Sequence, residues 1–122
     1  MVHIAGAAVE PRKTAIVFYR SRSGAEPVRE WLKSLPQADR QAIGQDLMRV
    51  QFRWPVGMPL CRALGQGLWE VRSDLPGNRI ARVLFCFHGG DLFALHGFVK
   101  KTRKTPTQDL GLARNRMKEI AT

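Results

Sequence analysis

Residues 79–106 read RIARVLFCFHGGDLFALHGFVKKTRKTP and predict two long strands joined by a tight turn. On both sides of Gly89-Gly90 the chain is rich in aromatic and branched aliphatic residues, which favour strands. A Gly-Gly dipeptide supplies the positive backbone angles that a two-residue hairpin turn needs. We therefore expect strands at 79–88 and from 91 to about 101. Four cations lie within 100–104, where the end of a strand would hold them as a fixed array facing a polyanion.

Upstream of this hairpin, the sequence predicts one more strand, a loop, two helices and a first strand. Residues 68–73 alternate as a strand does, whereas prolines and glycines break up 55–67 and predict a loop. A short helix ends at Pro36, which opens a second helix at 37–53, and the apolar run 15–19 predicts the first strand. Apolar residues at helical spacing form the buried stripes of this helical hairpin: Val28, Trp31, Leu32 and Leu35, then Ile43, Leu47 and Val50.

Downstream of the hairpin, the sequence predicts a closing helix. Thr105 is expected to cap this helix, Pro106 suits its first position and Gln108 completes a capping box. Its apolar seam is Leu110, Ala113, Met117 and Ile120. The order β-α-α-β-β-β-α predicts an α+β domain, in which the helical hairpin packs on a small twisted antiparallel sheet. We expect a flexible lead-in at 1–12 and a single domain at 13–122.

The composition favours a nucleic-acid partner. The 122 residues carry 20 Lys and Arg against 10 Asp and Glu, a formal charge of +10, which suits nucleic acid first and an anionic partner protein next. We expect no membrane span, because no run of about 18 apolar residues occurs, and no signal peptide. Cys61 and Cys86 have no close Cys or His neighbours in the sequence. They therefore predict two reduced thiols in a cytoplasmic protein, and we expect neither a metal site nor a cofactor.

The hairpin register places the charges on one face or the other. With a two-residue turn, His88 faces Asp91, and counting outward puts Arg82 opposite Gly97. Gly97, which has no Cβ, would then leave room beside the guanidinium for a phosphate or a base. This register puts Arg82 on a partly open face and His96 on the opposite, aromatic face. A three-residue turn would exchange these partners.

Three segments together resemble phage-derived, HigB-like toxins of the RelE/ParE superfamily. Residues 64–72, LGQGLWEVR, look like the "LGxGLYELR" run of those toxins, and RIARVLF at 79–85 resembles their "YRVLY" strand. Residues 96–106, HGFVKKTRKTP, match their "HGFxKKTxKTP" segment. The resemblance covers about residues 14 to 120, and the last motif is the long and specific one.

This resemblance implies a RelE-like fold and the toxin of a type II toxin–antitoxin system. Such toxins are typically endonucleases that cut mRNA at the ribosome and are neutralised by a helix-turn-helix antitoxin. Arg82 matches the strand arginine placed at the scissile phosphate, Lys101 or Lys100 stands near the basic position ending the last strand, and Arg72 is a further candidate. Some ribonucleases of the superfamily use a tyrosine near the last helix, but the only tyrosine here is Tyr19. The other cations of this half are expected to contact RNA: Arg79, Lys100, Arg103 and Lys104.

The chemistry implied needs no metal, because the 2′-hydroxyl of RNA can attack the adjacent phosphate itself. Clustered cations would stabilise the developing charge, and a lysine made partly neutral by its neighbours or His96 could serve as the acid or base. Plainer interpretations stay open. His96 suits a hydrogen-bonded core position, and Arg72 with Glu70 suits a solvated strand face. Two rival functions also remain: a ParE-like inhibitor of a protein such as DNA gyrase, and a basic nucleic-acid-binding module without catalysis.

Overall fold

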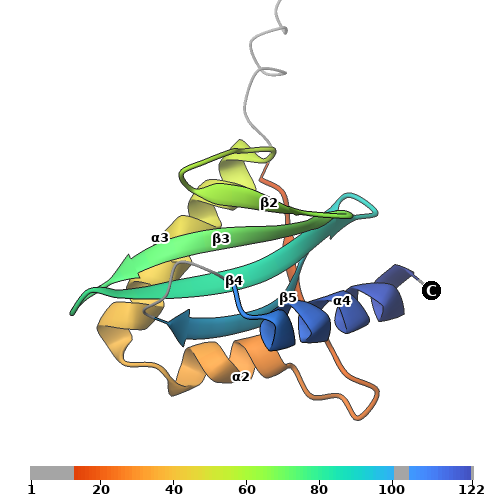
Figure 1. Cartoon of the computed structure of the whole chain (residues 1–122), viewed down its shortest axis with the longest axis horizontal. Coiled ribbons are helices and arrows are strands. Elements are labelled where there is room, and N and C mark those ends of the chain that lie inside the picture. Colours follow the sequence, from red (N-terminus) through yellow and green to blue (C-terminus); the bar gives the residue numbers. More distant parts are fainter. Residues whose placement is uncertain (1–12, 101–104, 122) are drawn as a thin grey trace, which may run out of the picture.

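The computed structural model describes residues 13–100 and 105–121, except for the side chain of Lys100, and they form five strands and three helices (Figure 1). The lead-in expected at 1–12 lies outside the described residues. In chain order the elements are β1 (Ile16–Phe18), α2 (Pro27–Ser34), α3 (Gln37–Arg53), β2 (Cys61–Gly65), β3 (Leu68–Leu75), β4 (Arg79–His88), β5 (Asp91–Lys100) and α4 (Thr107–Ala121). The α+β class, the helix at 37–53 and the hairpin strand at 79–88 are confirmed.

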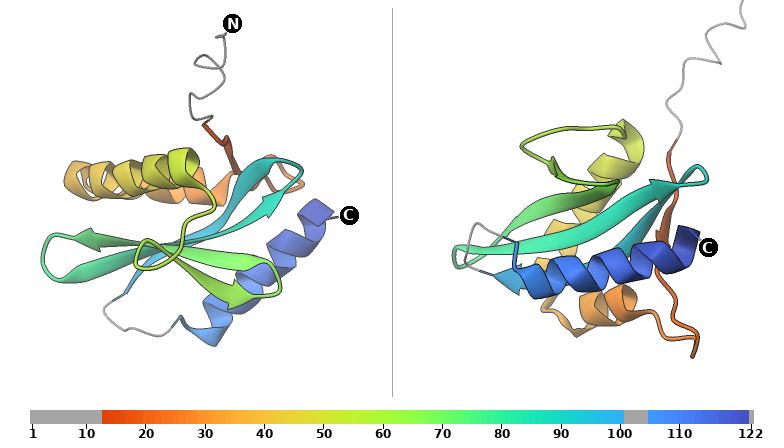
Figure 2. Two further views of the ribbon diagram at one scale, coloured as in Figure 1. Left: turned by 90° about the horizontal axis from the view of Figure 1, so that it is seen from above. Right: turned by 45° about the vertical axis from the view of Figure 1, so that its right-hand side comes forward.

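The strands form one mixed sheet in the order β1-β5-β4-β3-β2. Strand β1 pairs in parallel with β5, whereas every other neighbouring pair is antiparallel, so the expectation of a purely antiparallel sheet was wrong. Helices α2 and α3 cover one face of the sheet and α4 covers the other, which makes three layers (Figure 2).

Each face of the sheet carries its own hydrophobic core. The stripes predicted for the helical hairpin pack on one side, where Val28, Ile43 and Val50 are fully buried. The seam predicted for the last helix packs on the other side, where Ala113 is buried and Leu110, Met117 and Ile120 join it. Sequence periodicity therefore predicted the inward faces of all three helices.

Strand β2 lies inside the segment that was expected to be a loop. It forms the edge of the sheet beside β3, and a tight turn at Gln66-Gly67, both with positive φ, joins the two strands. Arg114 of α4 ties this turn down by donating to the carbonyl oxygens of Leu64 and Gly65. The prolines and glycines bound this strand rather than break it, and its sequence, CRALG, carries little strand propensity.

A bulge in the β4–β5 hairpin changes the register that simple counting predicts. His88 pairs with Asp91 as expected, but the pairing shifts between Leu84 and Phe85. As a result Leu84 pairs with His96, and Arg82 pairs with Phe98 rather than with Gly97. One extra residue on β5 thus places His96 on the same face as Arg82, the face that α4 covers, and the expectation of opposite faces was wrong.

Gly97 serves the other face of the sheet. A Cβ placed on this residue would lie 2.3 Å from Cζ3 and 2.5 Å from Cε3 of Trp31 on α2. The missing side chain therefore lets the indole ring approach the strand, and it does not open space beside Arg82.

Within residues 13–100 and 105–121, no helix is both long and apolar enough to cross a membrane.

Candidate nucleic-acid interface

Three neighbouring strands bring charged side chains together on the α4-facing side of the sheet. Arg62 on β2 pairs with Glu70 on β3, and Arg72 on β3 pairs with Arg82 on β4. Direct antiparallel partners point to the same face, and residues two apart on one strand share it. The sheet therefore gathers three guanidinium groups and one carboxylate at one place.

Arg82 lies inside this cluster rather than on its surface. Arg82 and Glu70 are both 0% exposed, and Nη1 of the arginine lies 3.5 Å from Oε1 of the glutamate. The hydroxyl of Thr105 donates to the same Oε1 over 2.8 Å and accepts from Arg82 Nη1 over 3.2 Å. The expectation of a partly open face around Arg82 was therefore wrong.

The groups around Arg82 change its pKa in opposite directions. Burial lowers the pKa of Arg82, the carboxylate of Glu70 opposes this change, and the charges of Arg72 and Arg62 add to the lowering. Thr105 joins this network instead of capping the last helix in the expected way. Helix α4 begins after Pro106, whose carbonyl oxygen accepts the amide of Leu110 over 3.0 Å.

Arg72 and Arg62 are the members of the cluster that reach solvent. Arg72 is half-buried, and its Nε is buried without a hydrogen-bond partner among the described atoms. Arg62 is exposed. Sequence reasoning missed Arg62 because it lies on a strand that was expected to be a loop. The sequence does contain one indication of this position. Arg62 lies just upstream of the residues LGQG, and the turn that they form brings Arg62 opposite Glu70.

His96 makes an acid–base pair with the first turn of α4. Its Nε2 lies 2.6 Å from Oδ1 of Asp109, and its ring stacks on Phe98 with centroids 5.6 Å apart. The His96 and Asp109 side chains are 16% and 19% exposed. The bulge in β5 brings this pair to the face of the sheet that carries the arginines, with His96 paired to Leu84, two residues from Arg82 on β4.

The other predicted cations fall into two groups. Arg79 donates two hydrogen bonds to Asp39 on α3, over 2.8 and 2.9 Å, and this contact raises the pKa of Arg79. That arrangement ties the start of β4 to the helical hairpin. The side chains of Lys100, Lys101, Arg103 and Lys104 lie outside the described residues.

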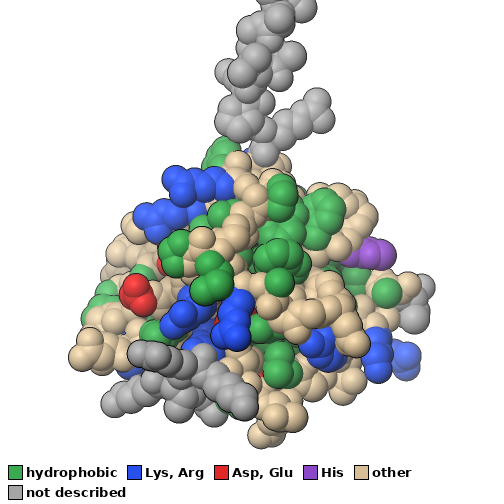
Figure 3. Space-filling view, turned by 45° about the horizontal axis from the view of Figure 1, so that its top comes forward, with side chains coloured by type: hydrophobic (Ala, Val, Ile, Leu, Met, Phe, Trp, Pro, Cys, Tyr) green, Lys and Arg blue, Asp and Glu red, His purple; other side chains and the backbone are tan. Residues whose placement is uncertain are grey.

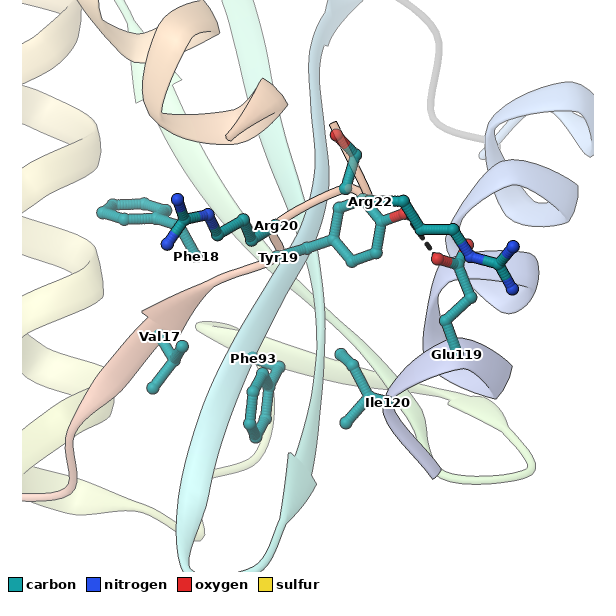
Figure 4. A pocket seen from close by; sticks show the side chains of 9 residues that line it. Val17, Phe18, Tyr19, Arg20, Arg22, Phe93, Glu119 and Ile120 are labelled. Atoms are coloured by element: carbon teal, nitrogen blue, oxygen red, sulfur yellow. Dashed lines mark hydrogen bonds between the residues drawn. The ribbon is translucent and has the colours of Figure 1, made fainter. Parts of the chain in front are cut away.

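Tyr19 reaches the last helix at a different place. Its hydroxyl donates to Oε1 of Glu119 over 2.9 Å, and Arg116 lies over its ring, 5.0 Å from the centroid. Burial and the contact with Glu119 raise the pKa of Tyr19. This tyrosine lines an open pocket of about 430 Å³ beside β1 (Figure 4). Because α4 has 15 residues, the pocket is about 20 Å from the end of the helix nearest Arg82.

Figure 3 shows Lys and Arg side chains gathered between hydrophobic ones on one face of the molecule. Among the residues that the structure describes, no three His, Cys, Asp or Glu side chains lie together as metal ligands would.

A family model described as phage-derived protein Gp49-like matches residues 30–118, from α2 to the last turns of α4. The chain belongs to the Gp49-like family. This family is related to the RelE-type toxins of toxin–antitoxin systems. No curated protein matches the Gp49-like chain.

Proposed function

We propose that this Gp49-like protein is the toxin of a type II toxin–antitoxin system and cuts mRNA at the ribosome. The family relation supports the class of protein, and the HigB-like motifs of the sequence support the kind of toxin. The formal charge of +10 suits a polyanionic substrate.

One observation carries the proposal of RNA cleavage. Arg62, Arg72 and Arg82 come from three adjacent strands onto one face, and each pair of neighbouring strands is held in register by the sheet. Such a preorganised cationic cluster stabilises the charge that gathers on the nonbridging oxygens of a phosphodiester during attack. Arginine also offers a planar fork that matches two phosphate oxygens.

The arginines divide their roles according to burial. Arg72 and the exposed Arg62 are the groups that contact the phosphate. Arg82 is a positioning residue, because the Glu70 and Thr105 contacts hold its guanidinium inside the protein. Its charge still contributes to the field at the site, and the network fixes Thr105, which directly follows the predicted basic segment 100–104.

The proton transfers are assigned to His96 with Asp109. An imidazole accepts a proton from the 2′-hydroxyl near neutral pH, and the 2′-oxygen then attacks phosphorus. The bond from phosphorus to the 5′-oxygen breaks, that oxygen takes a proton from solvent water as it leaves, and the imidazolium of His96 returns its proton to the solvent. The products are a 2′,3′-cyclic phosphate and a 5′-hydroxyl. Asp109 orients the ring through its contact with Nε2 and stabilises the imidazolium that forms.

Brief induction of the protein in cells, followed by mapping of RNA ends, tests this function. The expected result is new 5′-hydroxyl and 2′,3′-cyclic phosphate ends within translated messages. A supercoiling assay of DNA gyrase run in parallel separates the main rival. Intact RNA together with inhibited supercoiling would select a gyrase-type target, and salt-dependent RNA binding without cuts, even with ribosomes, would select a binding module.

The helix-turn-helix antitoxin and the cytoplasmic site of action follow from the same proposal. The antitoxin should bind this protein tightly and suppress RNA cutting. Co-expression with the product of a neighbouring small reading frame, followed by co-purification and a growth assay, tests that pairing.

A further inference from the structure

A second basic pocket opens where the edge of β3 meets the end of α3. Its volume is about 630 Å³, and it lies beside the segment that connects α3 to β2. Three arginines line it: Arg49 and Arg53 from the last turns of α3, and Arg72 from β3. Among the described strands, none pairs with this side of β3 beyond Val71, and the amide of Arg72 donates to the carbonyl oxygen of Leu60 over 3.2 Å, so the pocket lies at the edge of the sheet.

The cations of this pocket are not equivalent. Arg49 is bound to Asp46 one turn earlier, with Nη1 2.5 Å from Oδ1, and much of its charge is thereby balanced. Arg53 is exposed at the end of the helix. The side chain of Arg72 lines this pocket, and its charge also acts on Arg82 in the arginine cluster. Its Nε is buried and has no hydrogen-bond partner in the described part of the chain. Arg53 and Arg72 are therefore the groups suited to hold an anion.

The rest of the lining has the character of a base-binding site. Met58 is 70% exposed and stands with Val56, Pro59 and Leu60 on the apolar side of the pocket. The carboxylate of Asp74, an exposed residue two positions after Arg72, also lines it. These groups match the three parts of one nucleotide. The apolar wall suits a flat base, the two cations suit a phosphate, and the carboxylate suits an amino group of the base.

We infer that this pocket binds one nucleotide of the RNA that flanks the cleaved bond. Its phosphate lies between Arg53 and Arg72, its base packs on Met58 and Leu60, and Asp74 accepts a hydrogen bond from an exocyclic amino group. Adenine, cytosine and guanine have such a group and uracil does not, so the pocket disfavours uracil. This inference rests on the proposed function, because it takes RNA as the ligand and places the cleaved bond at the arginine cluster. Arg72 connects the two places, so a strand bound at the arginine cluster continues over the edge of β3 into the pocket.

Binding of uncleavable RNA tests the pocket separately from catalysis. Fluorescence anisotropy measures the affinity of 2′-O-methyl oligonucleotides for the full chain and for two variants. Arg53→Ala should weaken binding about tenfold, because one charge-assisted contact is lost, and should reduce the slope of log K against log salt by about one. Arg40→Ala is the matched control, since Arg40 is an exposed residue of the same helix about 20 Å from Arg53 along its axis. It should leave both quantities unchanged.

The choice of base gives a second, independent result. Oligocytidine should bind several-fold more tightly than oligouridine. Asp74→Ala should remove this difference and leave the slope of log K against log salt unchanged. Equal losses in Arg53→Ala and Arg40→Ala would show only diffuse attraction and would overturn the inference, as would equal binding of the two oligomers. If unmodified RNA is cut while Arg53→Ala binds normally, the pocket is wrong and the proposed function stands. If RNA is bound through Arg53 but never cut, the pocket stands and the proposed function is wrong.

Discussion

Arg82 and Glu70 form an ion pair that is completely buried between neighbouring strands, with the hydroxyl of Thr105 bridging them. Burying two charges is costly, and it succeeds only when hydrogen bonds satisfy both groups. Thr105, which lies just before α4, provides a hydrogen bond to each partner, whereas Oε2 of Glu70 is buried without one among the described atoms. The pair therefore joins the sheet to the start of the last helix.

Neutralising one partner of this pair should strongly destabilise the protein. Glu70→Gln leaves the guanidinium of Arg82 buried without its counter-charge, and the expected loss in free energy of unfolding is about 3–5 kcal/mol. Urea denaturation followed by circular dichroism measures it. Arg62→Ala, which removes an exposed cation of the same face, should change stability by less than about 0.5 kcal/mol. An unchanged unfolding midpoint in Glu70→Gln would refute the buried pair.

Adding a methyl group at residue 97 should disturb the opposite face of the sheet. In Gly97→Ala the new Cβ collides with the ring of Trp31, and we expect a loss of about 1–3 kcal/mol. Trp31→Leu, which removes the colliding ring, costs stability by itself but should make the further change Gly97→Ala nearly neutral. Additive losses in the double variant would contradict a direct contact between these two residues.

The two thiols should resist modification in the folded protein. Burial raises the pKa of Cys61 from 9.0 to about 12 and also raises the pKa of Cys86, so the reactive thiolate is scarce at pH 8. A thiol reagent should therefore react slowly until denaturant is added. Rapid labelling of both thiols under native conditions would contradict their burial.

The same shift implies that stability falls at alkaline pH. The unfolded chain releases the Cys61 proton near pH 9, whereas the folded chain holds it to about pH 12. Stability from this group is therefore complete below about pH 9 and is lost as the pH rises toward 12. Cys61→Ala should flatten the fall in Tm between pH 9 and pH 10.5 relative to wild type, while Cys86→Ala reports the effect of the second thiol, which has the same direction.

The pairing of His96 with Asp109 predicts a distinct kinetic signature. His96→Gln should lower the rate of RNA cutting about 10²–10⁴-fold, because the group that accepts the 2′-hydroxyl proton is lost. Asp109→Asn should reduce the rate less, because the imidazole remains and loses only the carboxylate that orients it. A merely structural histidine would lower the unfolding midpoint in both variants and leave the rate of cutting by the remaining folded protein at the wild-type value.

Much of the fold could be predicted because local patterns agreed with the tertiary structure. Apolar spacing located α2, α3 and the inward face of α4, and Gly89-Gly90 located the hairpin turn. The bulge opposite Leu84 could not be read in this way, because one extra residue on a strand leaves its composition unchanged. That single shift moved Gly97 to the side of Trp31 and His96 to the side of Arg82.

The candidate site was predicted in its residue types and only partly in its geometry. Arg72 and Arg82 were both candidates, but the sequence does not determine the register of β3 against β4, and only the structure shows that the two residues pair directly. The burial of Arg82 depends on Thr105, which is distant in sequence, so no local pattern indicates it. Arg62 was missed because β2 acquires its strand structure from pairing with β3 rather than from its own sequence.

The most direct test of the account is the single-turnover rate of cutting of ribosome-bound mRNA by Arg72→Ala and by the control Arg40→Ala. The account predicts a rate about 10²–10³-fold below wild type for Arg72→Ala, with unchanged circular dichroism and unfolding midpoint, and a wild-type rate for Arg40→Ala. Equal rates for wild type and Arg72→Ala would contradict the claim that the guanidinium groups of this sheet act on an RNA phosphodiester.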